Sequence, residues 1–294
     1  MTETNLGIVV VNYGSHALLA ANLALLCESL SEATIVVVDN WSTTDERRRI
    51  TALAADNDWT LVPSEHNLGF GAGMNRGARV ALDAGCTHLL LLNPDVAIGA
   101  EAVRELVEAS IARPGTLLSP RLLRPDGTVW FAGGQLDPRS GLTRSAVDTA
   151  QVGPGRWISG ACLLVDAGSW SRLGGFDESY FLYWEDIDLS QRFLDLGGEL
   201  RVEHDIVGVH AAGGTQGSEL KSPLYARYMC RNRLRYAARR LPRRDRLRWL
   251  ALAPSYALRI LRRDGYRAAL RRPSYVLAAL DGTARGAVDI ARAA

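Results

Sequence analysis

The chain has 294 residues, of which 47% are hydrophobic and 22% charged, so its composition is that of a globular protein and excludes a disordered or collagen-like chain. Its four cysteines lie far apart and form no C-x-x-C pair, which argues against a disulfide framework or a structural zinc site. The N-terminus enters an apolar segment without a preceding basic region. This predicts a first strand, no signal peptide and a cytoplasmic protein.

The net charge of +2 conceals an uneven distribution. Residues 227–272 contain 16 arginines and two acidic residues, whereas residues 1–226 contain 16 basic and 28 acidic ones. Arg-rich segments with interspersed Leu and Trp are typical of helices that lie on anionic membranes, but also of solvated surfaces and nucleic-acid patches. The longest uncharged run in this tail, 249–258, has ten residues, and a membrane span needs about 20. The composition leaves the three kinds of surface open.

In chain order, apolar runs alternate with helix-like segments over the first 120 residues. We predict a strand at 7–13, a helix at 15–30, a strand at 34–39 and a second helix after capping residues at 42–46. A short strand at 59–63, a helix at 71–84, a strand at 88–93 and a helix from residue 100 to just before Arg113 follow. This alternation predicts an α/β fold with a doubly wound, mostly parallel sheet flanked by helices.

The second half of the chain is less regular. Residues 133–155 are polar and rich in Gly and Pro, and we predict a long loop or irregular hairpin before a strand at 157–165. A second Gly-rich loop is predicted at 213–218. After residue 222 the sequence changes to Arg-rich helices, which we interpret as a C-terminal appendage. The chain is therefore divided into a domain at 1–221 and a basic helical region at 222–294.

Polar residues follow the predicted strands at the edge where parallel sheets bind ligands. Asn12, Asp39, Asn67 and Asp95 each lie at or just past a strand end, which predicts a shared cleft. In this position Asp95 suits a divalent cation, although an Asp also commonly caps the next helix. His210 ends another apolar segment, and its spacing alone leaves a metal ligand, a surface residue and a core residue as alternatives.

Glycines 69, 71, 73 and 77 do not form a dinucleotide-binding motif, because no window satisfies G-x-G-x-x-G. They lie at a predicted helix start, where exposed N–H groups suit a diphosphate. The alternative is a tight turn that needs positive φ.

The stretch YFLYWEDID, residues 180–188, sets three acidic residues among aromatic ones. In a helix that starts at the acids and runs to about residue 196, Glu185 and Asp188 share a face and Asp186 points away from it. Asp186 would then face the cleft as a general base, with Glu185 and Asp188 in structural or orienting roles. An acidic first helical turn without a catalytic role is the alternative.

These segments follow one another in a specific order. The ordered set consists of Val11-Asn12-Tyr13, 38–42, 67–69 with Asn75, Asn93-Pro94-Asp95, 159–161, 174–177, Trp184-Glu185-Asp186 and His210. Over roughly residues 6–236 it resembles the family 2 glycosyltransferases of the GT-A fold. The Asn-Pro-Asp, Trp-Ile-Ser-Gly and Glu-Asp-Ile-Asp contexts are most similar to bacterial rhamnosyltransferases of cell-envelope polysaccharide synthesis.

The resemblance implies roles on the nucleotide-sugar side of the cleft. Asp39 would read the pyrimidine base, and the residues that would shape the rest of the nucleotide-sugar site are Asn12, Tyr13, Asn67, Gly69, Asn75, Asn93 and Asp95. Asp95 and His210 would bind Mg²⁺ or Mn²⁺. Asn93 stands where many relatives have the first Asp of the metal motif, which makes the site less negative.

The resemblance also implies the reaction. Asp186 would be the catalytic base beside Glu185, and Trp184 and Tyr183 would stack on the acceptor sugar or, alternatively, pack the helix. The implied activity is an inverting transfer of a sugar, L-rhamnose from dTDP-rhamnose, to a hydroxyl of a saccharide or polyprenyl diphosphate-linked acceptor. A UDP-hexose or UDP-galactose donor and a non-catalytic nucleotide-sugar-binding protein are the alternatives.

A lipid-linked acceptor favours an anionic membrane surface as the contact of the basic tail. This predicts a cytoplasmic protein that is peripheral at the inner face of the cell membrane. Nucleic-acid binding is not expected, because the tail lacks the aromatic interleaving of a stacking platform and the acidic front domain would repel phosphate.

Overall fold

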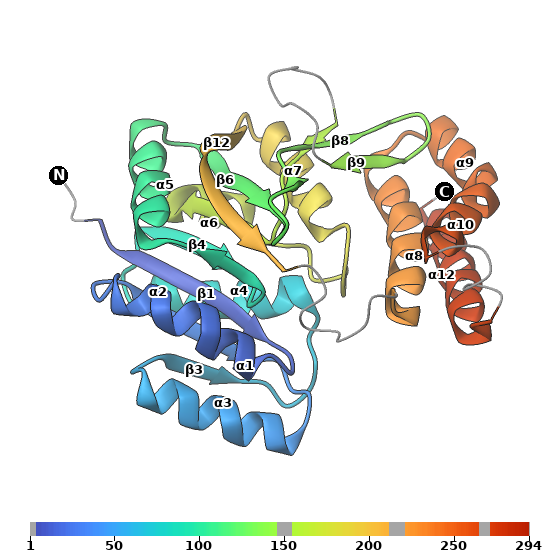
Figure 1. Cartoon of the computed structure of the whole chain (residues 1–294). Coiled ribbons are helices and arrows are strands. Elements are labelled where there is room, and N and C mark those ends of the chain that lie inside the picture. Colours follow the sequence, from blue (N-terminus) through green and yellow to red (C-terminus); the bar gives the residue numbers. More distant parts are fainter. Residues whose placement is uncertain (1–3, 146–154, 212–220, 265–270, 294) are drawn as a thin grey trace.

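The computed structural model describes residues 4–145, 155–211, 221–264 and 271–293. Figure 1 shows a curled central sheet with helices on both faces and a group of C-terminal helices gathered at one side. The predicted loop at 213–218, and residues 146–154 of the predicted loop or hairpin, lie outside the described residues. The predicted fold class is confirmed by this arrangement.

The main sheet has the strand order β3-β2-β1-β4-β11-β6-β12-β5. Its strands are β1 (Leu6–Asn12), β2 (Thr34–Asp39), β3 (Thr60–Pro63), β4 (His88–Leu92), β5 (Val96–Ile98), β6 (Thr116–Leu123), β7 (Val129–Phe131), which pairs with β6, β11 (Cys162–Asp166) and β12 (Glu199–His210). Strands β3, β2, β1 and β4 are parallel, so their carboxyl ends meet at one rim. Strand β11 runs antiparallel to β4, and β12 runs antiparallel to the short β5.

The helices of this part agree closely with the predicted segments, apart from α6 (Ala167–Leu173), which was not predicted. They are α1 (His16–Leu18), the π turn η1 (Leu19–Leu23), α2 (Ala24–Glu28), α3 (Thr44–Asp56), α4 (Phe70–Asp83), α5 (Ala100–Ala112), α6 (Ala167–Leu173) and α7 (Glu185–Asp195). The predicted cap of α3 is present, since the Thr43 hydroxyl accepts a hydrogen bond from the Glu46 N–H at 3.1 Å.

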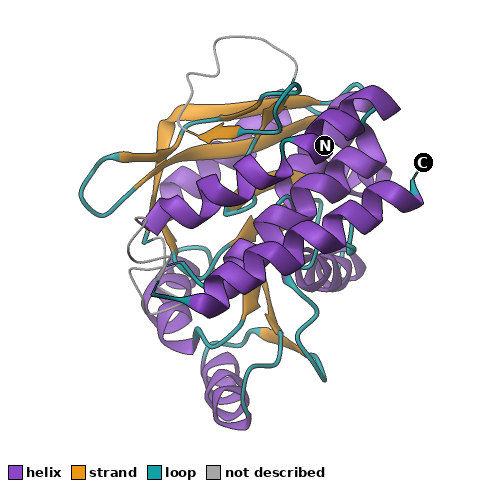
Figure 2. Ribbon diagram, turned by 90° about the vertical axis from the view of Figure 1, so that its right-hand side faces the viewer, coloured by secondary structure: helices purple, strands orange, loops and turns teal. Residues whose placement is uncertain are grey.

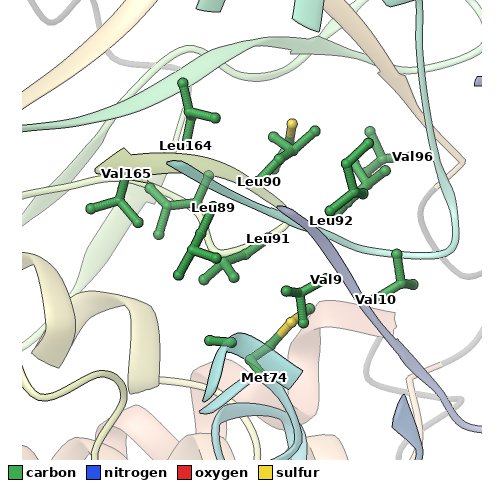
Figure 3. Packing of buried hydrophobic residues seen from close by; sticks show 14 of the residues in the cluster. Val9, Val10, Met74, Leu89, Leu90, Leu91, Leu92, Val96, Leu164 and Val165 are labelled. Atoms are coloured by element: carbon green, nitrogen blue, oxygen red, sulfur yellow. The ribbon is translucent and has the colours of Figure 1, made fainter. Parts of the chain in front are cut away.

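The glycine-rich start of α4 serves helix–sheet packing. A Cβ at Gly77 would lie 2.4 Å from Val9 Cγ1, and one at Gly73 would lie 2.9 Å from Val11 Cγ2, so only glycine lets the helix backbone approach β1 this closely. Figure 3 shows Met74 of α4 beside Val9 in the same contact. The burial of Gly71, Gly73 and Gly77 is thus explained by packing, and a diphosphate at the helix start stays a prediction.

The strand predicted at 157–165 is two strands that belong to different sheets. Strand β10 (Arg156–Trp157) pairs with β8 (Gly134–Leu136), which in turn pairs with β9 (Thr143–Ser145) in a three-stranded sheet. The chain then leaves this sheet and joins the main one as β11. The break between them spans residues 158–161, where the Ile158 N–H donates to the Ser190 hydroxyl of α7 at 3.1 Å.

The C-terminal helices are α8 (Pro223–Arg240), α9 (Arg243–Ala251), α10 (Ala253–Leu261), the short η2 (Arg262–Asp264) and α12 (Pro273–Arg292). Figure 2 shows them lying side by side in front of the strands. They share a buried cluster with Tyr180, Trp184 and Ile187, so α8 and α9 pack directly on the segment that precedes and begins α7. The division of the chain at residue 221 stays a prediction.

In the described part of the chain, no helix combines the length and apolar character that a bilayer crossing requires.

Candidate active site

The parallel rim brings Asn12 and Asp39 together. They are neighbours in the β1–β2 register, and both are buried. Arg47 Nε contacts Asp39 Oδ2 at 2.5 Å, while Asp39 Oδ1 has no hydrogen-bond partner among the described residues. Buried polar atoms are nearly always paired, so this oxygen marks a place where a ligand can bind. The neighbouring Tyr13 is 49% exposed and is open to such a ligand.

The Asn67–Gly69 loop is held against this rim by Asn40, a residue that the sequence analysis did not single out. Asn40 Oδ1 accepts from the Leu68 N–H at 2.8 Å, and its Nδ2 donates to Asn67 Oδ1 and to the Gly69 carbonyl, both at 3.0 Å. Its position directly after Asp39 at a strand end was the signal that could have found it.

Gly69 is required by its surroundings. Its φ of +88° lies in the left-handed region, and a Cβ there would lie 2.3 Å from the Phe181 carbonyl oxygen. The Phe70 N–H donates to the same oxygen at 2.9 Å. The rim loop and the segment before α7 are thus in direct backbone contact.

Asn75 does not face the rim, and its predicted role at the nucleotide is wrong. Its Oδ1 accepts from the Phe176 N–H at 2.8 Å, and its Nδ2 donates to the Phe176 carbonyl at 2.9 Å and to Glu178 at 3.0 Å. The amide is therefore used to fasten α4 to residues 176–178.

Asp95 and His210 come together because β12 pairs antiparallel with β5. His210 is the register partner of Val96, and the Ala211 N–H donates to the Asp95 carbonyl at 2.9 Å. His210 Nε2 lies 3.2 Å from Asp95 Oδ1, yet neither ring nitrogen makes a hydrogen bond within the described residues. Both side chains are buried, and Trp130 covers the imidazole with ring centroids 4.0 Å apart.

This pair fits a divalent cation that is shared with a ligand. A buried carboxylate next to an imidazole supplies two donor groups suited to Mn²⁺. Over the described ranges, no cluster of three His, Cys, Asp or Glu side chains could hold a metal. Ligand oxygens and water would therefore have to complete the coordination shell, as Mg²⁺ sites with few protein ligands commonly do.

Asn93 connects the metal pair to the segment that carries Asp186. Its N–H donates to the Ala161 carbonyl at 2.8 Å, and its Oδ1 is buried without a partner among the described residues. The adjacent Gly160 N–H reaches Asp186 Oδ2 in a long hydrogen bond of 3.5 Å. The Asp186 side chain is thus linked to the Asn93 turn through the adjacent residues Gly160 and Ala161.

Burial gives Asp186 the properties of a base. Desolvation raises the pKa of its carboxyl from 3.8 to about 6, although hydrogen bonds from the Ile187 and Gly160 N–H groups act in the opposite direction. A carboxylate with this pKa is ionised at neutral pH and still basic enough to accept a proton.

The two other acids of this segment are more deeply buried. Desolvation, together with the charge of Asp186, raises the pKa of Glu185 well above its ordinary value, and Glu185 Oε2 has no partner in the described part of the chain. Asp188 accepts from Arg192 Nε at 2.7 Å, and Arg192 in turn donates to the Leu173 and Gly175 carbonyls. Asp188 therefore fastens α7 to the preceding loop.

Trp184 does not present its ring to an acceptor. It is 1% exposed and packs against Tyr236 and Trp249, with ring centroids 5.6 and 6.1 Å away. Its predicted stacking role is wrong, because the ring fills the core between α7 and α8. Tyr183 is partly exposed and meets Tyr225 edge to face at 5.2 Å, so it keeps a surface that a ligand can touch.

Comparison with known proteins identifies the fold and family of the chain. The family model described as "Glycosyl transferase family 2" matches residues 7–150. An "N-acetylglucosaminyl-diphospho-decaprenol L-rhamnosyltransferase" of Mycobacterium tuberculosis is 31% identical over 230 residues, 67% of this chain and 72% of that protein. The chain belongs to glycosyl transferase family 2. The family predicted from the ordered motifs is thereby confirmed.

Other similarities extend this result. The "Low-salt glycan biosynthesis hexosyltransferase Agl10" of Haloferax volcanii is 28% identical over 200 residues, 64% of this chain and 61% of that protein. Among solved structures, the mannosyltransferase PcManGT from Pyrobaculum calidifontis, with GDP-Man and Mn²⁺, has a TM-score of 0.59 at 17% identity and covers 99% of this chain and 88% of that one. GalNAc-T7 with UDP, GalNAc and Mn²⁺ has a TM-score of 0.60 at 16% identity and covers 80% and 51%. These structures share the GT-A fold.

Proposed function

We propose that this family 2 glycosyltransferase is an inverting enzyme that transfers L-rhamnose from dTDP-rhamnose to a hydroxyl of a saccharide or polyprenyl diphosphate-linked acceptor. The donor and acceptor classes rest on the similarity to the mycobacterial rhamnosyltransferase. The observation that carries the chemistry is the half-buried Asp186 carboxylate, whose raised pKa and contact with Gly160 suit a base next to the Asn93 turn.

The reaction would be a single displacement. Asp186 accepts the proton of the acceptor hydroxyl while the hydroxyl oxygen forms a bond to the anomeric carbon of the donor. The bond from that carbon to the dTDP oxygen breaks, and dTDP leaves with the electron pair. Attack from the face opposite the diphosphate inverts the anomeric configuration. Asp95 and His210 would hold Mg²⁺ or Mn²⁺, which would offset the charge on the departing diphosphate.

Asp39 would select the base of the donor. Its Oδ2 is occupied by Arg47, so Oδ1 remains as an acceptor. A carboxylate can only accept a hydrogen bond, and thymine and uracil offer an imino N–H, whereas neutral cytosine offers a ring nitrogen acceptor. Cytosine still offers its exocyclic amino group to a carboxylate, so we expect dTDP and UDP to bind more tightly than CDP, without complete rejection of CDP.

The test is incubation of the purified protein with Mn²⁺, a panel of dTDP- and UDP-sugars, and a polyprenyl diphosphate-linked N-acetylglucosamine acceptor, followed by mass spectrometry. A mass increase of one deoxyhexose with dTDP-rhamnose supports the proposal. Transfer of a hexose from a UDP-sugar supports the second candidate, a UDP-hexose-dependent enzyme, which the similarity to an archaeal hexosyltransferase favours. Nucleotide-sugar binding without any transfer would leave only a binding protein.

We also propose that the C-terminal helices contact an anionic membrane from the cytoplasmic side. Many arginines of α8 are used internally, since Arg235 pairs with Asp289 and Arg240 with Asp195. The surface of α9 and α10 instead combines exposed cationic and apolar side chains, namely Arg243, Arg244, Leu247, Leu252, Leu258 and Arg259. Such a mixed surface is typical of interfacial helices.

Flotation with vesicles that contain phosphatidylglycerol tests this contact. Replacement of Arg243, Arg244 and Arg259 by Gln should reduce binding at low salt by about 1 kcal/mol per arginine. The charge-matched control replaces Arg79, Arg124 and Arg172, which are exposed on the other part of the molecule. Equal loss in both triple variants would show only a nonspecific charge effect and would contradict the proposed surface.

A further inference from the structure

The turn immediately before α7 has an unusual backbone. Tyr183 and Trp184 have φ values of 67° and 75°, in the left-handed region that side chains with a Cβ disfavour. Among the described residues they are the only two consecutive non-glycine residues with positive φ. Such conformations cost about 1–3 kcal/mol each and persist only where surrounding contacts impose them.

This turn sets the position of Asp186. Helix α7 begins at Glu185, directly after the two strained residues, and Asp186 is its second residue. A change of backbone at Tyr183 or Trp184 would rotate the first turn of α7 and displace the Asp186 carboxyl from Gly160. The contacts that hold the turn therefore help to set the position of the Asp186 carboxyl.

Asn232 of α8 makes the polar contacts to this turn. Its Nδ2 donates to the Leu182 carbonyl at 2.9 Å and to the Tyr183 carbonyl at 2.8 Å. Both partners are acceptors, so only the NH₂ end of the amide can serve them. The Asn232 side chain is fully buried, which strengthens these bonds because water does not compete for the carbonyls.

We propose that Asn232 is a positioning residue that holds the Leu182–Trp184 turn in its strained conformation and thereby keeps the Asp186 carboxylate in place to receive the acceptor proton. This inference rests on the proposed function, in which Asp186 is the base. It assigns a role in the reaction to a residue in the Arg-rich region, 46 positions after Asp186 in the sequence. Loss of Asn232 should therefore affect the rate of transfer more than the affinity for the donor.

The test compares Asn232→Ala with Arg233→Met. Arg233 is the adjacent residue of α8, is equally buried, and also donates to two backbone carbonyls, those of Trp249 and Ser140, at 3.0 and 2.6 Å. Neither of these carbonyls belongs to the Leu182–Trp184 turn, although the Trp249 ring packs on Trp184. Arg233→Met therefore controls for the loss of two buried hydrogen bonds next to the same core. Both variants should have a lower melting temperature, but only Asn232→Ala should lower kcat, by about 10- to 100-fold with little change in the donor KM.

Two further readouts distinguish positioning from general damage. The acid limb of the kcat–pH profile, near pH 6 in the wild type, should move to lower pH in Asn232→Ala, because a displaced Asp186 is better solvated. In the Asn232→Ala background, Tyr183→Gly should recover part of kcat, since glycine adopts positive φ without strain. If Asn232→Ala does not fold, Asn232→Ser, which keeps one donor, is measured by the same criteria.

The possible outcomes separate this inference from the proposed function. An unchanged acid limb, together with a loss of kcat equal to that of Arg233→Met, overturns the positioning role. Full turnover by Asp186→Asn overturns the proposed base itself. Inactive Asp186→Asn together with a shifted profile in Asn232→Ala supports both.

Discussion

The rim at the ends of β1, β2 and β4 and the turn before α7 differ in what fixes their side chains. At the rim, Asp39 Oδ1 is buried without a hydrogen-bond partner among the described residues. In the turn, Asn232 holds the Leu182 and Tyr183 carbonyls, and the ring of the strained Trp184 is buried. A rim with a free acceptor is suited to binding, whereas a clamped turn is suited to placing one group accurately.

This difference predicts which substitutions should change ligand affinity and which should change the rate of transfer. Substitutions in the rim should alter the binding of the nucleotide or of the metal, because they remove atoms that await a ligand. Substitutions around the turn should alter turnover or stability, because they release strain or remove the base. Five experiments on four variants can break or sharpen this comparison.

The largest effect is expected for Asp186→Asn. General base catalysis contributes about 10²- to 10⁴-fold, so kcat should fall by that factor while the donor KM changes little. Transfer of radiolabelled rhamnose to the acceptor measures kcat. Turnover at the wild-type rate would remove Asp186 from the mechanism.

The same variant should be more stable than the wild type above pH 6. The folded-state pKa of Asp186, about 6, lies above its unfolded value, so the native state binds more protons and loses stability as the pH rises from about 4 through 6. Asparagine removes the cost of ionising the buried group, which we expect to be about 1–3 kcal/mol. Thermal melts of both proteins at pH 4 and pH 8 provide the measurement, and a lower stability of the variant at pH 8 would contradict it.

Gly69→Ala tests the contact between rim and turn. The new Cβ would collide with the Phe181 carbonyl and also meet a φ of +88°, so we expect a loss of about 3 kcal/mol from strain and displaced backbone. Gly85→Ala is the matched control, since Gly85 has a φ of +86° and nothing within 4 Å of an added Cβ. It should lose only about 1 kcal/mol. Equal losses in urea unfolding would show that the contact with Phe181 is unimportant.

His210→Ala tests the metal pair. Loss of one of the two proposed protein ligands should weaken Mn²⁺ activation by at least about 10-fold. The control is His88→Ala. His88 is the first residue of β4, at the end of the strand away from Asn93 and Asp95, so its loss should leave the Mn²⁺ titration of activity unchanged. A metal titration that is the same for both variants would exclude His210 as a ligand.

The smallest effect is expected for Asp39→Asn. The amide keeps the volume of the side chain but replaces a charged acceptor by a neutral one, a change worth about 1 kcal/mol, or about fivefold in the donor KM. The kcat should be retained, because Asp39 is part of the rim. Initial rates at varied dTDP-rhamnose concentration separate the two constants, and a loss confined to kcat would contradict the comparison.

Much of the rim could be predicted from the sequence because each residue follows its own strand. The predicted strand at 34–39 is β2 to the residue, and Asp39 ends it. The predicted helix at 71–84 is shifted by one residue from α4, and the predicted helix at 185–196 ends one residue after α7. Strand ends are local features, since apolar periodicity and capping residues are visible within a few positions.

The turn could not be predicted in the same way. The aromatic residues of 180–184 have the same pattern whether they stack on a sugar or fill a core, and only the packing of α8 and α9 shows that Trp184 is buried. Asn75 resembled a ligand residue until its amide was found to be used by Phe176. The prediction of one strand at 157–165 was wrong because the hydrophobic pattern does not show that the chain passes from one sheet to another.

The sequence by itself determined the alternation of strands and helices, the polar residues at the strand ends and the order of motifs that reveals the family. Only the tertiary structure decided which of these residues meet. His210 reaches Asp95 through the antiparallel β5–β12 register, and Asn232 reaches the turn before Asp186 through the packing of α8. The physical reason is that hydrophobic periodicity is encoded over a few residues, whereas partners that are distant in sequence are chosen by the closure of the whole core.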